Sequence, residues 1–461
     1  MKNGLAADLS GVVGARHLLD KDDLAGRSPG WNPDNLRAAC LVRPRTTAEV
    51  AAVLRLCHEW GQTVVPQAGL TGLVQGTSTV PGDLILSMER MNAVQEIDNA
   101  NRTMTVEAGV TLQAAQEAAD AAGLFLPLDL AARGSCTIGG NIATNAGGNR
   151  VIRYGMTREN ILGLEAVLAD GTVLSSMNRM IKNNAGYDLK HLFIGSEGTL
   201  GVVTRAVLRL REQPQSRLTA LAALESFEAI AGFLKHMDRS LGGGLSAFEV
   251  MWREFYEAVA TVVRPHSPPL AFGHAYYVVV EFLGADGDAD CARFEAALEQ
   301  AFDAGLLVDA VLASSSAQAR EIWDIRDQSE HAESASGPTV TFDVSLPIGA
   351  MEAYVAKVRD ELAAQGRRPG CFVFGHLGDG NLHFMVPAEP GSDTDRHAVE
   401  AVVYGHLEAL RGSVSAEHGI GLEKKAWLGH SRTPEELAVM RTLKCALDPK
   451  GILNPGKVFD T

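Results

Sequence analysis

The stretch "GHLGDGNLH", from Gly375 to His383, carries two histidines, an aspartate and an asparagine among three glycines. The apolar segments on either side, "CFVFG" and "FMV", each predict a strand, so two strand ends can bring His376 and His383 to one place. Downstream, "SAEHGIG" sets Glu417 beside His418. Two histidines and a carboxylate are a common ligand set for a catalytic divalent metal with open positions.

The same histidines have a second interpretation without a metal. They can lie on a surface loop in which Asp379 and Asn381 form Asx turns. For an isolated pair of histidines this interpretation is the stronger one, and the added "EHG" favours the metal. In either case Asp379 and Asn381 are expected to shape the loop or support the ligands rather than to bind an ion.

Three glycine-rich segments suggest a second kind of chemistry. Their sequences are "PQAGLTGLVQGTS" (66–78), "PLDLAARGSCTIGGNIATNAGGN" (127–149) and "NNAGYDLKHLFIGSEGTLGVVT" (183–204). Glycine turns let backbone N–H groups approach an anion without any basic side chain. None of the segments matches the GxGxxG or GxxxxGK[ST] pattern, which disfavours nicotinamide and Walker-type nucleotide sites. Together they predict an extended, phosphate-bearing cofactor.

The elements that must position these groups mix helices and strands without a strict βαβ rhythm, which favours an α+β fold. "TTAEVAAVLRLCHEWG" (46–61) and "TLQAAQEAADAAG" (111–123) predict capped helices, and "ENILGLEAVLADGTVLSS" (159–176) predicts a hairpin that turns at Asp170 and Gly171. The polar stretch "REQPQSR" (211–217) is the best linker candidate. A second α+β domain is expected after it.

Chain length, net charge, cysteine count and apolar runs disfavour several classes of protein. The 461 residues are too many for one ordinary core, and two or three domains are expected. A formal charge of -15 disfavours nucleic acid as a partner. The six scattered cysteines suggest neither a disulfide framework nor a cysteine zinc site. No apolar run is long enough to cross a bilayer. We therefore expect a cytoplasmic protein with no transmembrane segment.

Five motifs carry a family resemblance: "IGGNIATNAGG", "GYDLKHLFIGSEGTLG", "GHLGDGNLH", "SAEHGIG" and "LDPKGILNPGK". In this order they resemble the FAD-linked D-2-hydroxy-acid dehydrogenases of the vanillyl-alcohol oxidase / p-cresol methylhydroxylase superfamily. That group includes D-2-hydroxyglutarate dehydrogenase, D-lactate dehydrogenase and the glycolate oxidase flavoprotein subunit. The resemblance implies an FAD-binding domain at 1–211, a substrate and metal-binding domain at 212–419, and a C-terminal segment, 420–461, that returns to the FAD domain.

The resemblance also implies which residues bind FAD. They are Pro66, Gln67, Ala68, Gly69, Leu70, Thr71, Gly72, Gln75, Gly76, Ser135, Thr137, Gly140, Asn141, Thr144, Gly147, Glu197, Gly198, Gly201, Val202 and Asn454. Two residues depart from the usual Pro-x-Gly-Gly-Asn-Thr-Gly loop, because Ala68 replaces a glycine and Leu70 replaces the asparagine. Some relatives attach flavin to a histidine in this loop. Here the loop has none, so we expect FAD to be non-covalent.

By the same resemblance, His376, His383 and Glu417 are metal ligands and His418 is the general base. Zinc is the expected metal and manganese the alternative. A D-2-hydroxy acid would bind the metal through its hydroxyl and one carboxylate oxygen, and His418 would take the hydroxyl proton. Hydride would then pass to flavin N5, giving the 2-oxo acid.

Arg326 lies in "SSAQAREIWDIRDQSEHAESA" (315–335), which predicts one helix. It aligns with the family arginine that binds the substrate carboxylate; the simpler alternative is an i, i+4 pair with Glu330. By the resemblance, the hydroxyglutarate branch has a hydroxyl residue, a lysine and an asparagine where this chain has Glu330, Thr341 and Met385. A second substrate carboxylate would be repelled by Glu330, with no lysine at Thr341 to offset the repulsion. We therefore expect a substrate with a neutral side chain, similar to D-lactate, with D-2-hydroxyglutarate as the alternative.

Two other classes of function remain open. One is a metal-dependent hydrolase with a non-redox glycine-rich domain, and the other is a non-catalytic electron-transfer flavoprotein. A dehydrogenase would need an external electron acceptor, and electron-transfer flavoprotein, a quinone or a cytochrome would serve. A homodimer is also considered.

Overall fold

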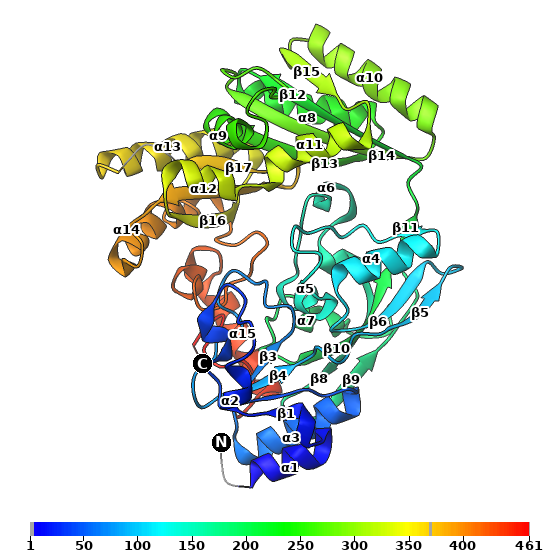
Figure 1. The fold of residues 1–461 in the computed structure, drawn as a ribbon, viewed down its shortest axis with the longest axis vertical. Coiled ribbons are helices and arrows are strands. Elements are labelled where there is room, and N and C mark those ends of the chain that lie inside the picture. The colour runs from blue at the N-terminus through cyan, green and yellow to red at the C-terminus, as the bar shows by residue number, and fades with distance from the viewer. Residues whose placement is uncertain (1–3, 368–370, 461) are drawn as a thin grey trace. The chain divides into compact units, whose positions relative to one another are not determined.

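A computed structural model describes residues 4–367 and 371–460 (Figure 1). The chain forms two compact units. Unit 1 contains residues up to 147, residues 155–213 and residues from 417 onward, and unit 2 contains residues 148–154 and 214–416. In the described part of the chain, no helix combines the length and the hydrophobicity that a membrane crossing requires.

Unit 1 contains two main sheets. The first has the order β1-β2-β4-β3, with strands β1 (Leu18–Leu19), β2 (Cys40–Val42), β3 (Val64–Gln67) and β4 (Leu84–Ser87). The second is antiparallel in the order β5-β6-β10-β8-β9, with β5 (Val94–Asp98), β6 (Thr103–Glu107), β8 (Ile161–Val167), β9 (Val173–Ser176) and β10 (Val202–Arg209). The β8–β9 pair confirms the predicted hairpin.

The helices of unit 1 are α1 (Leu5–Val13), α2 (Lys21–Leu24), α3 (Thr47–Trp60), α4 (Leu112–Ala121), α5 (Ile138–Thr144), α7 (Lys190–Phe193) and α15 (Pro434–Leu447). Helix α3 starts and ends where the sequence predicts. The Thr46 hydroxyl accepts the Glu49 N–H at 3.2 Å, and Gly61 ends the helix in the left-handed conformation. Its buried stripe, including Val50, Val53 and Leu54, joins a core shared with both sheets.

A short third sheet corrects the predicted linker. Strand β11 (Arg211–Glu212) pairs with β7 (Leu124–Phe125), and β12 of unit 2 begins at Ser216. The first three residues of "REQPQSR" are thus part of unit 1, and only residues 213–215 lie between the strands. In the C-terminal segment, Leu453 forms a parallel bridge with Val64 on the outer side of β3, the edge strand of its sheet.

Unit 2 is built on one antiparallel sheet in the order β15-β12-β14-β13-β17-β18-β16. Its strands are β12 (Ser216–Leu224), β13 (Leu245–Trp252), β14 (Tyr276–Gly284), β15 (Asp309–Leu312), β16 (Thr339–Ser345), β17 (Phe372–His376) and β18 (Asn381–Pro387). Its helices are α6 (Val151–Tyr154), α8 (Phe227–Ser240), α9 (Arg253–Val263), α10 (Gly287–Asp303), α11 (Ser316–Asp327), α12 (Glu330–Ser336), α13 (Met351–Ala364) and α14 (Asp393–Tyr404).

Helices cover both faces of this sheet, so the central strands are buried throughout rather than on alternate residues. Residues of α9, α11 and α12 join one apolar cluster with Met251, Tyr277 and Phe374 of the sheet. On α8, Phe233 packs against Phe248 of β13, whose side chain alternates with that of Met251. A charged side chain inside such a strand must find its partners within the protein.

Candidate functional site

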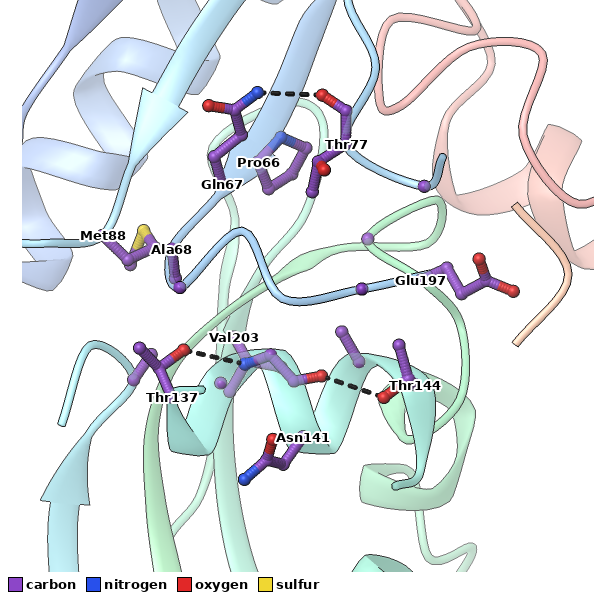
Figure 2. A pocket seen from close by; sticks show the side chains of 18 of the residues that line it. Pro66, Gln67, Ala68, Thr77, Met88, Thr137, Asn141, Thr144, Glu197 and Val203 are labelled. Carbon is purple, nitrogen blue, oxygen red and sulfur yellow. Dashed lines mark hydrogen bonds between the residues drawn. The ribbon is translucent and has the colours of Figure 1, made fainter. Parts of the chain in front are cut away.

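A cavity of about 1020 Å³, partly open to solvent, lies in unit 1 (Figure 2). The loop after β3, helix α5, and the loop that leads into β10 form most of its wall. His418 and Asn454 complete the wall from the C-terminal segment.

The glycines of this cavity let one backbone approach another. A Cβ added at Gly69 would lie 2.2 Å from the Ser135 carbonyl oxygen, and one at Gly139 would lie 2.7 Å from the Ala108 Cβ. By contrast, a Cβ at Gly72 would meet no atom within 4 Å. The first two glycines are therefore needed for close packing, while Gly72 leaves the backbone open for a ligand.

Side chains brace the loops that surround the cavity. The Gln67 amide donates to the carbonyl oxygens of Asn35 and Thr77, at 2.7 and 2.8 Å, so it holds the loop rather than facing a ligand (Figure 2). The Thr137 hydroxyl caps α5 by accepting the Gly140 N–H at 3.3 Å. Between these loops, Met88 and Val203 contribute apolar wall.

Glu197 ties the cavity wall to the loop that carries His418. Its carboxylate accepts the N–H groups of Ile420 and Gly421 at 2.7 and 2.8 Å. Burial raises the pKa of Glu197, and the two N–H donors and the nearby Lys424 oppose that rise. The residue has a φ of 51°, an unfavourable conformation for a non-glycine residue, as Leu70 and Asn454 also do in this wall. Such strain is often concentrated at functional sites.

A second group of polar side chains lies in unit 2. The predicted strands β17 and β18 bring the rings of His376 and His383 together, with centroids 5.3 Å apart. On the neighbouring strand β13, the Glu249 carboxylate accepts from His376 Nδ1 at 2.8 Å and from Arg326 Nε at 2.8 Å. Burial alone would raise the pKa of Glu249, but its interactions with His376 and Arg326 hold the pKa below its usual range.

Arg326 is buried at the end of α11, with its guanidinium 5.0 Å from the Phe374 ring centroid. Its Nη2 lies 3.3 Å from His376 Nε2. Sequence reasoning missed Glu249, whose only local signal is a carboxylate within the apolar strand "LSAFEVMW".

Asp343 of β16 is a further acidic residue that sequence reasoning missed. It pairs with His383 across β16 and β18, is fully buried, and accepts from the Asn381 amide at 3.0 Å. Its carbonyl also accepts the N–H of Ala416 at 3.3 Å. Glu417 is the next residue along the chain and the first of the last segment of unit 1. Its role as a third ligand stays a prediction.

Comparisons with known proteins identify the family. Residues 213–458 match the FAD linked oxidases, C-terminal domain family, and residues 38–176 match an FAD binding domain family. The chain is 41% identical to the mitochondrial D-2-hydroxyglutarate dehydrogenase of Bos taurus over 99% of its own length and 83% of that protein. It is 42% identical to the D-2-hydroxyglutarate dehydrogenase of Xanthomonas citri pv. viticola over 94% of its own length and 90% of that protein. It is 35% identical to a putative D-lactate dehydrogenase of Schizosaccharomyces pombe over 99% of its own length and 88% of that protein.

This chain belongs to the family of FAD-dependent D-2-hydroxyglutarate and D-lactate dehydrogenases. It is therefore an oxidoreductase, and FAD is its cofactor. Its fold is also that of p-cresol methylhydroxylase, with a TM-score of 0.79, 16% identity, and coverage of 99% of this chain and 97% of that one. The α+β fold and the family expected from the motifs are confirmed.

Seventeen of the twenty predicted cofactor residues line the cavity of this family member; Gln75, Ser135 and Gly147 do not. The Gln75 amide donates to Glu423, and the Ser135 carbonyl lies against Gly69. Additional residues in the wall were missed. They are Val74, Thr77, Met88, Ala108, Cys136, Gly139, Ala143, Phe193, Ser196 and Val203. Several of them lie inside the glycine-rich motifs, whereas Met88 and Ala108 carry no local signal.

The segment around Arg326 differs from the prediction. It forms two helices, α11 and α12, separated at Gln328, rather than one. Arg326 pairs with Glu249 across the unit, so the simpler alternative, a helical pair with Glu330, is not what satisfies it. Glu330 and Thr341 are exposed, and Met385 packs in the apolar cluster with Phe374.

Proposed function

We propose that this chain oxidises D-2-hydroxyglutarate to 2-oxoglutarate with non-covalent FAD and a divalent metal. The observation that carries the proposal is similarity along almost the whole chain to D-2-hydroxyglutarate dehydrogenases, together with the glycine-walled cavity. The fit to FAD rests on the open backbone at Gly72 and on the apolar wall, which suit a diphosphate and flat rings respectively.

In this proposal each unit has a separate task. When bound, FAD supplies the hydride acceptor. The loops around Gly69 and Gly72 hold the cofactor, and His418, which lies in the cavity wall, takes the proton from the substrate hydroxyl. Arg326 of unit 2 binds the substrate carboxylate through its terminal nitrogens, because Glu249 already occupies Nε; of these, Nη2 also contacts His376 Nε2.

The imidazoles of His376 and His383, with Glu417, would hold the metal. A carboxylate can only accept a hydrogen bond, so Glu249 places the His376 proton on Nδ1 and leaves Nε2 with a lone pair. That donor set suits zinc and also allows manganese. A divalent ion supplies Lewis acidity that lowers the pKa of the substrate hydroxyl.

The expectation of a neutral substrate side chain depended on repulsion from Glu330, on the missing lysine at Thr341 and on the apolar Met385. Glu330 is exposed in the structure, and water screens an exposed charge, so its effect on a distal carboxylate is small. The named relatives favour D-2-hydroxyglutarate. Buried Met385 and the similarity to a putative D-lactate dehydrogenase keep D-lactate as the second candidate.

Anaerobic bleaching of the flavin tests the substrate. We expect D-2-hydroxyglutarate to give the highest kcat/KM in a panel with D-malate, D-2-hydroxybutyrate, D-lactate and the L-isomers. A higher value for D-lactate would overturn the assignment in favour of an apolar substrate. A yellow protein that none of these acids bleaches would instead indicate a non-catalytic electron-transfer flavoprotein.

The state of the flavin and the electron acceptor are tested separately. Residues 66–78 contain no histidine, so acid precipitation should release FAD from the polypeptide. Flavin retained in the pellet would contradict this expectation. Reoxidation of the reduced enzyme by electron-transfer flavoprotein, a quinone or a cytochrome would identify the class of acceptor.

A further inference from the structure

Glu249 is placed to organise two functional side chains at once. It is 1% exposed, and every residue of its strand β13 is buried. It lies directly opposite His376 in the pairing of β13 with β17. Its two oxygens have different partners, because Oε1 accepts from His376 and Oε2 accepts from Arg326.

The bond to His376 fixes the state of that ring. With the proton on Nδ1, Nε2 is unprotonated and carries a lone pair, which is the form of the ring that binds a metal. Without Glu249 the ring would lose the carboxylate that favours this tautomer and orientation. Carboxylates behind a ligating histidine commonly have this orienting effect.

The bond to Arg326 fixes the second group. Glu249 holds Nε, and the aromatic face of Phe374 lies beside the guanidinium, so the direction of the two terminal nitrogens is set. Nη2 lies 3.3 Å from His376 Nε2, the same nitrogen that would bind a metal. A change in the position of His376 is therefore expected to change the surroundings of the Arg326 guanidinium, and the reverse.

We propose that Glu249 is a positioning residue that orients His376 for metal binding and Arg326 for the substrate carboxylate. The inference rests on the proposed function, but metal binding can be measured with no substrate present. Failure of the substrate assignment would therefore leave this test intact.

A second buried glutamate provides a matched control. Glu281 of β14 is also 1% exposed, and its Oε1 accepts from Arg150 Nε and from the Ser246 hydroxyl, both at 3.1 Å. A buried glutamate with a purely structural role should behave in the same way at both positions. The two substitutions Glu249→Gln and Glu281→Gln remove the same charge from the same sheet.

The experiment uses the full FAD-loaded chain and zinc alone. Zinc dissociation constants come from competition with a chelator, FAD content from absorbance, and KM from turnover of D-2-hydroxyglutarate. We expect Glu249→Gln to weaken zinc binding about 10- to 100-fold and to raise KM, with FAD content unchanged. Glu281→Gln should keep the zinc affinity and KM of the wild type even if its Tm falls.

Glu249→Asp keeps the negative charge on a side chain that is one methylene shorter. It provides a second test of the proposal if Glu249→Gln does not fold. It should fall between the wild type and Glu249→Gln in zinc affinity. Wild-type zinc affinity in either Glu249 variant would overturn the proposal. Equal losses in Glu249→Gln and Glu281→Gln, or a wild-type chain that binds no zinc, would overturn it as well.

Discussion

The cavity of unit 1 and the His376–Arg326 cluster of unit 2 are built in different ways. Loops and small residues shape the cavity, and at Gly69 a single added carbon would touch another backbone. In unit 2, Glu249, His376 and Arg326 come from two strands and a helix, and their charges and hydrogen bonds hold them. The first region should therefore be sensitive to added volume, and the second to lost charge or lost ligands.

The largest expected effect comes from removing a predicted ligand in unit 2. His376→Ala or His383→Ala should eliminate metal binding and reduce turnover by about 1,000-fold or more, since a metal contributes several kcal/mol to such a reaction. FAD should stay bound, because the cavity residues belong to unit 1. Metal analysis and flavin absorbance of the purified variants check this. Normal metal content with a normal rate would rule out the ligand assignment.

His418→Ala tests the proposed general base in the cavity wall, and its expected effects differ from those of the two ligand variants. The variant should keep its metal and its FAD but lose about 100- to 10,000-fold in kcat, the usual contribution of a general base. Steady-state kinetics together with metal analysis distinguish this result from that of the ligand variants. If His418→Ala loses metal instead, the assignment of base and ligand must be revised.

Gly69→Ala tests whether the cavity depends on backbone packing. The added Cβ would lie 2.2 Å from the Ser135 carbonyl, and overpacking of this kind costs about 1–3 kcal/mol. FAD affinity should fall about 10- to 100-fold while zinc binding is kept. Gly82→Ala is the control, because a Cβ there meets nothing within 4 Å. Equal FAD affinity in both variants would show that the cavity adapts to the added carbon.

The smallest expected effect is a gain in stability at Leu70. Its φ of 52° is left-handed, which costs about 1–2 kcal/mol for an ordinary side chain and less for asparagine. Leu70→Asn should therefore raise the free energy of unfolding by about 1 kcal/mol, seen as a higher Tm. Leu73→Asn, at an exposed neighbouring position whose φ is not positive, should give no gain. A lower Tm for Leu70→Asn would mean that the apolar contacts of Leu70 outweigh its strain.

Local patterns predicted much of the fold because the interactions behind them are close in sequence. The cap at Thr46 and the turn at Gly171 each involve neighbouring residues. The strands around His376 and His383 also followed from a short stretch of sequence. The break at Gln328 was missed because the sequence has neither glycine nor proline there to indicate it.

The partners of the site residues were harder to predict. Glu249 and His376 are 127 residues apart, and Glu197 and Ile420 are 223 residues apart. Only the pairing of β13 with β17 brings the first two together, and no local periodicity encodes that pairing. The sequence thus predicted the chemical groups, whereas the tertiary structure was needed to find the carboxylates that orient them.

The short segment 148–154 has a consequence for dividing this protein into fragments. It belongs to unit 2, although unit 1 contains the residues on both sides, so the chain passes between the units four times, after residues 147, 154, 213 and 416. Arg150 of this segment forms a buried ion pair with Glu281. A gene fragment that starts at Pro214 would remove Arg150 and leave Glu281 with the more distant Arg217, whose Nε lies 4.0 Å away, as a cationic partner. Loss of the buried partner should destabilise the fragment. One recombination crossover therefore cannot exchange unit 2 intact between relatives; a chimera must carry residues 148–154 along with it.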